Sequence, residues 1–251
     1  MLIITADDLG RDRATTDACL NCFRRRRITS ASIMVFMKDS ERAAELAVRE
    51  GLETGLHLNL VLPFDASGIA GSVSKSQGPA VRFFRRGPWT QVIYNPFITR
   101  SVASSFVAQL EEYRRLFGKD PVYYNGHRHF HLSLNMVLGG LLPSGAAVRR
   151  SFTFYAGEKG RLNRWFRRRI DIRLLRRCVS TDAFFSLKPV SDFDRLTRIV
   201  HLARTASVEL MVHPGSPDEL AVLTGDPFRL LIASARLGGF EALRSDAKGP
   251  S

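Results

Sequence analysis

The chain has 251 residues, of which 45% are hydrophobic, and carries a formal net charge of +13 at pH 7. This hydrophobic content excludes an intrinsically disordered chain and is sufficient for one large core. No apolar run approaches the roughly 18 residues of a membrane-spanning helix. We therefore expect a single α/β domain over residues 1–251.

The three cysteines, Cys19, Cys22 and Cys178, are too few for a disulfide framework and are typical of a reducing compartment. Cys19 and Cys22 form a CxxC pair, but no second pair completes a zinc site, so we expect structural roles. The opening Met-Leu-Ile-Ile-Thr lacks the basic start of a signal peptide and soon meets Asp7 and Asp8. These features predict a cytoplasmic protein.

The first part of the chain alternates strands and helices, which is typical of a parallel sheet. Residues 2–4 form a short apolar strand that leads into Asp7, Asp8 and the turn residue Gly10. Either carboxylate could cap the next helix, predicted over 13–26, but capping accounts for only one of the two. We then expect a strand at 32–36, a helix from Asp39 or Ser40 to Gly51, and a strand that carries His57.

Residues 63–96 contain Gly, Ser, Pro and scattered aromatic residues without a regular period. Since a long loop in a compact domain is usually functional, we interpret this segment as a lid-like excursion over a substrate site. An amphipathic helix is predicted over 99–117, ended by Gly118.

Three histidines alternate along the next segment, YYNGHRHFHL, at positions 127, 129 and 131. A short strand at 122–124 should end close to His127. If the segment stays extended, all three side chains point to one side; if it becomes helical, His127 and His131 share a face. Either geometry predicts that at least two imidazoles of this segment lie together, as in a metal site.

The second half continues the alternation. We expect a helix at 133–142, strands at 147–152 and 183–187, and a helix at 191–206. A strand at 208–212 delivers His213, where Pro214 and Gly215 stop regular structure. A final helix is predicted at 227–237, and the tail from Ser245 should be disordered.

Asp7, Asp8, His57, His127 and His213 all follow predicted strands, and the carboxyl ends of parallel strands meet at one edge where active sites assemble. About seven strands favour an incomplete seven-stranded (β/α) barrel, TIM-like, over an open sheet. One carboxylate with two or three imidazoles can hold a catalytic divalent metal that acidifies water. A second carboxylate could accept the proton and His213 could protonate a leaving group, which suits amide or ester hydrolysis.

Five motifs together resemble the YdjC-like carbohydrate deacetylase family, which includes chitooligosaccharide deacetylases and hopanoid-associated proteins. They are Ile3-Ile-Thr-Ala-Asp-Asp-Leu-Gly10, Thr29-Ser-Ala-Ser-Ile-Met-Val35, Gly55-Leu-His-Leu58, Asn125-Gly-His-Arg-His-Phe-His131 and Glu209-Leu-Met-Val-His-Pro-Gly215. The resemblance spans residues 2 to about 240. It implies a barrel of the glycoside hydrolase/deacetylase type and removal of an acetyl group from an N-acetylated sugar.

The resemblance also implies roles for individual residues. One divalent metal, Mg or Zn, would be held by Asp8, His57 and His127, with Asp7 as the base and His213 as the acid or oxyanion stabiliser. His129 and His131 are alternative metal ligands or support a ligand from behind, and Arg149 would orient Asp7 or bind substrate. Leu9 replaces the Phe common in the family, and Asn125 stands where many members have an Asp that would contact a ligand histidine.

Arginines gather in the segment 161–177, where basic and apolar residues recur at roughly helical spacing. This pattern is typical of a helix at an anionic lipid or membrane surface, and also of a solvated helix face. Nucleic acid is a less suitable partner, because no stacking platform accompanies the arginines. The alternative function is therefore a catalytically silent barrel that binds anionic lipid or polysaccharide. A homo-oligomer is compatible with the sequence.

Overall fold

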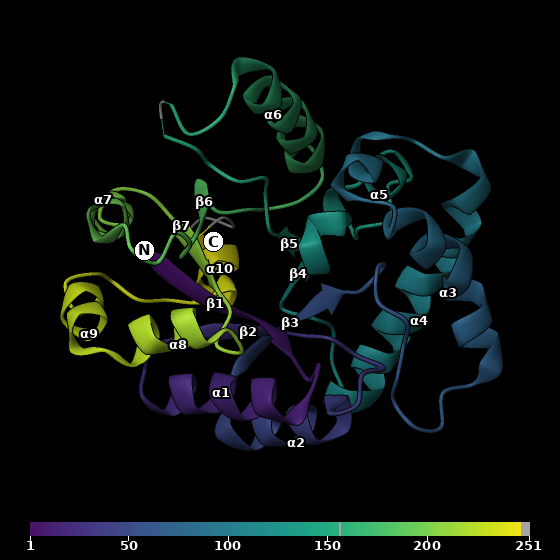
Figure 1. Ribbon diagram of the computed structural model, residues 1–251, viewed down its shortest axis with the longest axis horizontal. Helices are drawn as coiled ribbons and strands as arrows, with labels where there is room; N and C mark the ends of the chain where they lie inside the picture. The colour runs from purple at the N-terminus through teal and green to yellow at the C-terminus, as the bar shows by residue number, and fades with distance from the viewer. Residues whose placement is uncertain (156, 247–251) are drawn as a thin grey trace.

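A computed structural model describes residues 1–155 and 157–246, and these residues contain a seven-stranded, all-parallel sheet in the order β5-β4-β3-β2-β1-β7-β6 (Figure 1). The strands are β1 Leu2–Leu9, β2 Ser30–Ile33, β3 Glu53–Leu58, β4 Tyr123–Gly126, β5 Ala147–Val148, β6 Ala183–Ser186 and β7 Val208–Val212. The sheet curls, and helices cover its outer face. The prediction of an incomplete seven-stranded barrel is therefore confirmed.

The helices connect successive strands, as the alternating pattern predicted. They are α1 Arg13–Arg24, α2 Ser40–Glu50, α3 Gly71–Phe84, α4 Thr99–Phe117, α5 Leu134–Leu138, α6 Arg161–Leu175, α7 Phe193–Leu202, α8 Pro217–Thr224, α9 Asp226–Ile232 and α10 Phe240–Asp246, with short 3-10 segments η1 Pro88–Val92, η2 Pro96–Ile98 and η3 His127–Leu132. Two backbone hydrogen bonds join the chain at and after β5 to the chain at and before β6. The Val148 amide donates to the Val179 carbonyl and the Thr153 amide to the Phe184 carbonyl, both at 2.8 Å. These bonds draw the two edges of the curled sheet together.

Strand alternation divides the buried side chains into two sets. Leu2 and Ile4 of β1 belong to the large apolar core beneath the helices. Ile3, one position along, belongs with Tyr123 and Ala147 to a smaller cluster inside the barrel. Above that cluster the interior is polar, with Asp7 and Arg149 buried. The larger apolar core thus lies between the sheet and the helices, whereas the barrel interior holds the smaller apolar cluster and, above it, buried charged residues.

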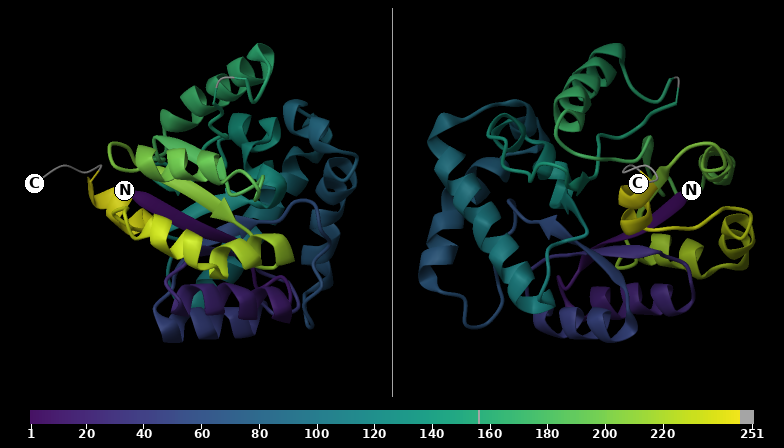
Figure 2. Two further views of the ribbon diagram at one scale, coloured as in Figure 1. Left: turned by 60° about the vertical axis from the view of Figure 1, so that its left-hand side comes forward. Right: turned by 180° about the vertical axis from the view of Figure 1, so that it is seen from behind.

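Helix α10 closes the amino-terminal end of the barrel. Phe240 stacks on Tyr123 with ring centroids 4.0 Å apart. The Glu53 carboxylate accepts the amides of Phe240 at 2.8 Å and Glu241 at 2.9 Å, which satisfies the first free N–H groups of the helix. In Figure 2 this end of the chain lies beside the start of β1. Any site inside the barrel therefore opens at the carboxyl ends of the strands.

The expectation of an irregular loop over 63–96 is wrong, because the segment contains α3 and η1 and ends at the first residue of η2. Pro79 interrupts the hydrogen bonding of α3, and the Ala80 amide donates instead to Ser101 Oγ of α4 at 3.1 Å. Ser101 Oγ in turn donates to the Ser76 carbonyl at 2.6 Å. The neighbouring helix therefore supplies the bonds that the proline removes, which local sequence does not reveal.

Other differences are smaller. β2 begins two residues before the predicted strand, β5 keeps only two residues, and α5 is half as long as expected. The predicted helix at 227–237 corresponds to the shorter α9, and α8 and α10 were not expected. Of the tail that was predicted to be disordered, Ser245 and Asp246 are the last residues of α10, and 247–251 lie outside the described residues. Across the described chain, none of the helices combines the length and apolarity needed to cross a bilayer.

Candidate metal centre

Asp7 and Asp8 lie where the regular structure of β1 breaks down. The pairing of β1 with β2 shifts register between Ala6 and Leu9, and Asp8 has a left-handed backbone with φ 68°. In a regular strand, adjacent side chains would point to opposite faces. The irregularity instead lets both carboxylates contact residues at the barrel mouth. Gly10, with φ 82°, then turns the chain towards α1.

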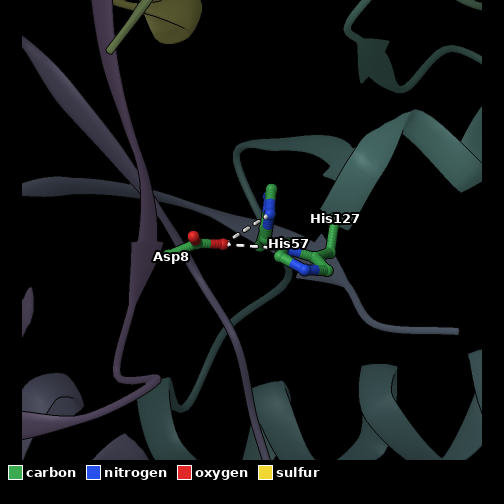
Figure 3. Close-up of side chains that lie close together, drawn as sticks. All are labelled: Asp8, His57 and His127. Atoms are coloured by element: carbon green, nitrogen blue, oxygen red, sulfur yellow. Dashed lines mark hydrogen bonds and ion pairs between the residues drawn. The ribbon is translucent and has the colours of Figure 1, made fainter. Parts of the chain in front are cut away.

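Asp8, His57 and His127 come together from β1, β3 and the start of η3 (Figure 3). Asp8 Oδ1 lies 3.2 Å from His57 Nε2 and 2.9 Å from His127 Nδ1. One ligand atom from each residue lies within 4.8 Å of the other two. Within residues 1–155 and 157–246, this is the one group of three or more His, Cys, Asp or Glu side chains with such spacing. Figure 3 shows both rings directed at the carboxylate.

Asn125 fixes the orientation of His57. Its amide oxygen accepts a hydrogen bond from His57 Nδ1 at 2.8 Å, so that Nε2 carries the free lone pair towards Asp8. The Asn125 amide nitrogen donates to Asp7 Oδ1 at 3.2 Å and to Ser32 Oγ at 3.1 Å. An ionised aspartate could not donate these bonds. Asn125 therefore connects His57 to Asp7 without adding a carboxylate to those of Asp7 and Asp8.

The donor set fits a divalent cation. Although burial raises the pKa of Asp8, its contacts with the His127 and His57 rings lower that pKa well below the ordinary value, so the carboxylate is ionised. One carboxylate and two imidazoles are the three protein ligands typical of catalytic zinc, and also suit harder divalent ions. Arg11 donates to the second oxygen, Asp8 Oδ2, at 2.8 Å. Oδ1 therefore remains the oxygen that faces both imidazoles.

Asp7 is held by Arg149 in a bidentate ion pair. Arg149 Nη1 lies 2.6 Å from Asp7 Oδ2, and Nη2 lies 2.8 Å from Asp7 Oδ1. The same guanidinium contacts Glu209 Oε1 through Nε at 2.8 Å and Nη2 at 2.7 Å. All three side chains are almost fully buried. Arg149 therefore contacts Asp7 inside the barrel, rather than presenting its guanidinium at the surface.

The three buried charges shift one another. Burial raises the pKa of Asp7, but the charge of Arg149 outweighs it and holds that pKa well below the usual range. Burial raises the pKa of Glu209, and Arg149 offsets this only in part. Arg149 therefore holds Asp7 in the anionic form.

Two of the three alternating histidines lie together, as expected, since the ring centroids of His129 and His131 are 6.3 Å apart, but neither ring belongs to the candidate metal group. Arg128 and His129 both adopt left-handed backbone conformations, with φ 51° and 62°, inside η3. His127 consequently meets Asp8, whereas His131 Nε2 donates to the Arg149 carbonyl at 3.0 Å. His129 packs edge-on against Phe152, with centroids 4.6 Å apart. The second imidazole of the metal group comes from His57.

His213 follows β7, the strand beside β1, and is anchored by Glu219 of α8. Glu219 Oε2 accepts the His213 amide at 2.7 Å, and Oε1 lies 3.2 Å from His213 Nδ1. Burial lowers the pKa of His213, but the bond to Glu219 and the charge of Asp7 raise it above its ordinary value. Since Nδ1 is bound to Glu219, Nε2 is the ring nitrogen available to other groups.

Ser32, Glu209 and Glu219 were not predicted as site residues. Glu209 interrupts the otherwise apolar strand VELMV, and such a charge in a buried strand is a usable signal. Ser32 and Glu219 carry no comparable signal, because serine is common in strands that face a barrel interior and Glu219 resembles an ordinary first-turn acid of a helix.

A cavity of about 610 Å³ is lined by Arg128 and His129 of η3, the two residues that follow His127 in the chain. The residues of the candidate metal group themselves do not line it. The remaining walls come from α6 and from the segment around η1, including Trp89 and Phe166. The cavity therefore has aromatic and basic walls next to the carboxyl edge of the sheet.

Known proteins resemble this chain in sequence and in fold. The sequence matches the family described as YdjC-like protein over residues 1–248. The chain belongs to this family. The resemblance inferred from the five motifs is thereby confirmed.

Several relatives of this YdjC-like protein are named deacetylases. A chitooligosaccharide deacetylase of Enterobacter sp. (strain 638) is 26% identical over 96% of this chain and 98% of its own. A carbohydrate deacetylase of Mus musculus is 30% identical over 52% of this chain, and the match covers only 43% of the mouse protein. A solved structure from Enterococcus faecalis V583, whose name refers to cellobiose-phosphate cleavage, superposes over 96% of this chain and 98% of its own with a TM-score of 0.65 at 17% identity, which shows the fold.

The role of Asn125 can be tested through metal affinity. Asn125→Ala should weaken binding of Zn²⁺ by about 10- to 100-fold, because His57 loses the acceptor that orients its ring. Isothermal titration with Zn²⁺ measures this. Asn135→Ala is the control, since Asn135 is equally buried but bonds Asn95 and Thr99. Equal affinity in the two variants would contradict the assignment.

The role of Arg149 can be tested through stability. Arg149→Met should lower the free energy of unfolding at pH 7 by about 3–5 kcal/mol, because Asp7 and Glu209 are left as buried, unpaired carboxylates. Their pKa values should then lie above those of the unfolded chain, so the loss should grow as pH rises. Urea unfolding at several pH values measures this. Arg149→Met/Glu209→Gln should recover part of the loss; no recovery and no pH dependence would disprove the pairing.

Proposed function

We propose that this protein is a metal-dependent deacetylase that hydrolyses the acetamide of an N-acetylated sugar in an oligosaccharide, glycolipid or glycan precursor. The observation that carries the proposal is the convergence of Asp8, His57 and His127 within 4.8 Å, with Asp7 ionised beside them. The deacetylase names of the relatives support the substrate class. The alternative of a catalytically silent barrel has no comparable support, since binding alone requires no such arrangement.

Asp8, His57 and His127 would hold one divalent metal, with Mg²⁺ and Zn²⁺ as the candidates. When bound, such an ion supplies Lewis acidity, which lowers the pKa of water and polarises an amide carbonyl. The protein orients these ligands through Asn125, which fixes the His57 ring.

Asp7 would accept the proton from the attacking water. Its Oδ1 already accepts bonds from Arg149, Ser32 and Asn125, whereas Oδ2 accepts one bond from Arg149. Oδ2 therefore retains a lone pair for a water molecule. Because Arg149 depresses the pKa of Asp7, this carboxylate is a weak base, and its contribution rests on fixed position beside the metal group.

His213 would protonate the departing sugar nitrogen. Its raised pKa favours the imidazolium form, and the bond to Glu219 leaves Nε2 as the proton donor. Asp7 and His213 come from the adjacent strands β1 and β7, so a proton acceptor and a proton donor stand at the same edge of the sheet.

The rest of the substrate would enter the cavity beside His129. Its walls include Trp89 and Phe130, whose faces suit sugar rings, and Arg128 and Gln91 supply polar contacts. The segment 63–96 contributes part of this wall, which supports its role as a lid. His129 and His131 would support the site from behind rather than bind the metal, and the cytoplasm remains the expected location.

Asp7→Asn should lower acetate release from N-acetylglucosamine oligomers by about 10²- to 10⁴-fold while metal content is unchanged, because the proton acceptor is lost but the ligands remain. Acetate release and metal analysis of the same preparations measure this. Asp17→Asn, at an exposed position, is the control. Unchanged turnover in Asp7→Asn would remove Asp7 from its proposed role.

The pH dependence tests His213. Activity should fall as pH rises through the pKa of His213, because the imidazolium loses its proton. Glu219→Gln removes the negative charge that helps to raise the pKa of His213, so the alkaline limb of kcat should move to lower pH. A pH profile of kcat measures the shift. Glu53→Gln, a change at a half-buried glutamate at the opposite end of the barrel, should leave the limb in place. A shift in both variants, or in neither, would contradict the assignment.

A further inference from the structure

Helix α6 contacts the rest of the protein with only one side. On this side, the α6 residues Ile170 and Leu174 are buried, and Phe166 packs at the edge of the core. Figures 1 and 2 show the helix at the periphery of the molecule, away from the layer formed by α1 and α2. Its opposite side therefore faces outward.

The outward side of α6 presents large apolar residues. Leu162 is 79% exposed and Trp165 is 54% exposed, one turn apart. Ile172 and Leu175 repeat this spacing at the other end of the helix and are 44% and 43% exposed. Single exposed apolar residues are common, but four at helical spacing on one short helix indicate a surface that is covered by something else.

Arginines surround this apolar stripe. The structure describes every residue of α6, and five of its arginines are exposed: Arg161, Arg164, Arg168, Arg169 and Arg173. The acidic residue of α6, Asp171, is buried and accepts the Ser151 amide at 2.8 Å, so it does not neutralise the outer side. The exposed side of α6 is therefore both apolar and positively charged.

The apolar stripe and the arginines together indicate which kind of partner would bind the outer side of α6. Nucleic acid would use the arginines but would gain little from Leu162, Ile172 and Leu175. A second copy of the chain could cover the apolar stripe, but two such helices would bring their arginines together, and like charges in contact repel. An anionic bilayer satisfies both features, since apolar side chains enter the headgroup boundary while arginines bind the lipid phosphates.

We propose that the outer side of α6 binds the protein reversibly to the surface of an anionic lipid bilayer. The inner side of the same helix lines the cavity through Phe166 and Arg167. A bilayer-bound α6 would therefore hold the cavity close to the membrane surface. The binding itself depends on α6 alone and does not rest on the proposed deacetylase activity.

Vesicle sedimentation tests the binding. The full chain should bind vesicles of phosphatidylcholine with one third phosphatidylglycerol, and binding should weaken with salt and be nearly absent on pure phosphatidylcholine. In a Trp89→Phe background Trp165 is the single tryptophan, and its fluorescence should shift to the blue on the anionic vesicles.

Two variants separate charge from apolar contact. Arg164→Gln/Arg168→Gln/Arg169→Gln should weaken binding by roughly fivefold for each arginine, about 100-fold together. Leu162→Ser/Trp165→Ser should weaken it by about tenfold or more. Each variant has a matched control at exposed positions outside α6. The control for charge is Arg25→Gln/Arg26→Gln/Arg49→Gln, and the control for apolar area is Val48→Ser/Leu230→Ser.

Both controls should bind as the unaltered chain does, and circular dichroism should show that all variants are folded. Equal effects of the α6 and control variants would overturn the proposal. So would full vesicle binding by Leu162→Ser/Trp165→Ser together with α6-dependent binding of double-stranded DNA, which would identify nucleic acid as the partner. Because no arm measures hydrolysis, failure here is distinguishable from failure of the proposed activity.

Discussion

The ion pair between Arg149 and Asp7 is the interaction on which the site depends. Removing three charged groups from water is costly, and a buried pair is weak evidence for stability by itself. Here the guanidinium lies between carboxylates from two adjacent strands, β1 and β7, and reaches them from the opposite edge of the sheet. It therefore connects the edge that carries β5 with β1 and β7 across the interior of the curled sheet, and fixes Asp7 as an anion where the barrel opens.

The metal group follows from irregular backbone at the strand ends. Asp8 can turn to the barrel mouth because it adopts φ 68° next to a shift of register. His127 can meet it because the next two residues are also left-handed. Such conformations cost of order 1–3 kcal/mol each and persist where surrounding contacts impose them. Asn125 joins this group to Asp7, so that the proposed base and the proposed metal ligands form one hydrogen-bonded unit.

The sequence predicted those parts of the fold that depend on local pattern. The bounds of α4 and β7 agree with their apolar periods, and the alternation of strands with helices predicted the parallel barrel. It did not predict α3, whose broken hydrogen bonds are completed by Ser101 of another helix. The apolar strands placed Asp8 and His127 at strand ends. The directions of the His129 and His131 side chains depend on left-handed backbone conformations, which the hydrophobic pattern does not reveal. Glu209 was missed because its partner Arg149 is 60 positions away in the chain.

The most direct test of the account is the position of the metal. A crystal of the protein grown with Zn²⁺ should show one anomalous-scattering peak at about 2.0–2.2 Å from Asp8 Oδ1, His57 Nε2 and His127 Nδ1. Asp7 should lie beside the ion without binding it, still paired with Arg149. A peak at His129 or His131, or a peak that Asp7 ligates in place of Asp8, would contradict the account.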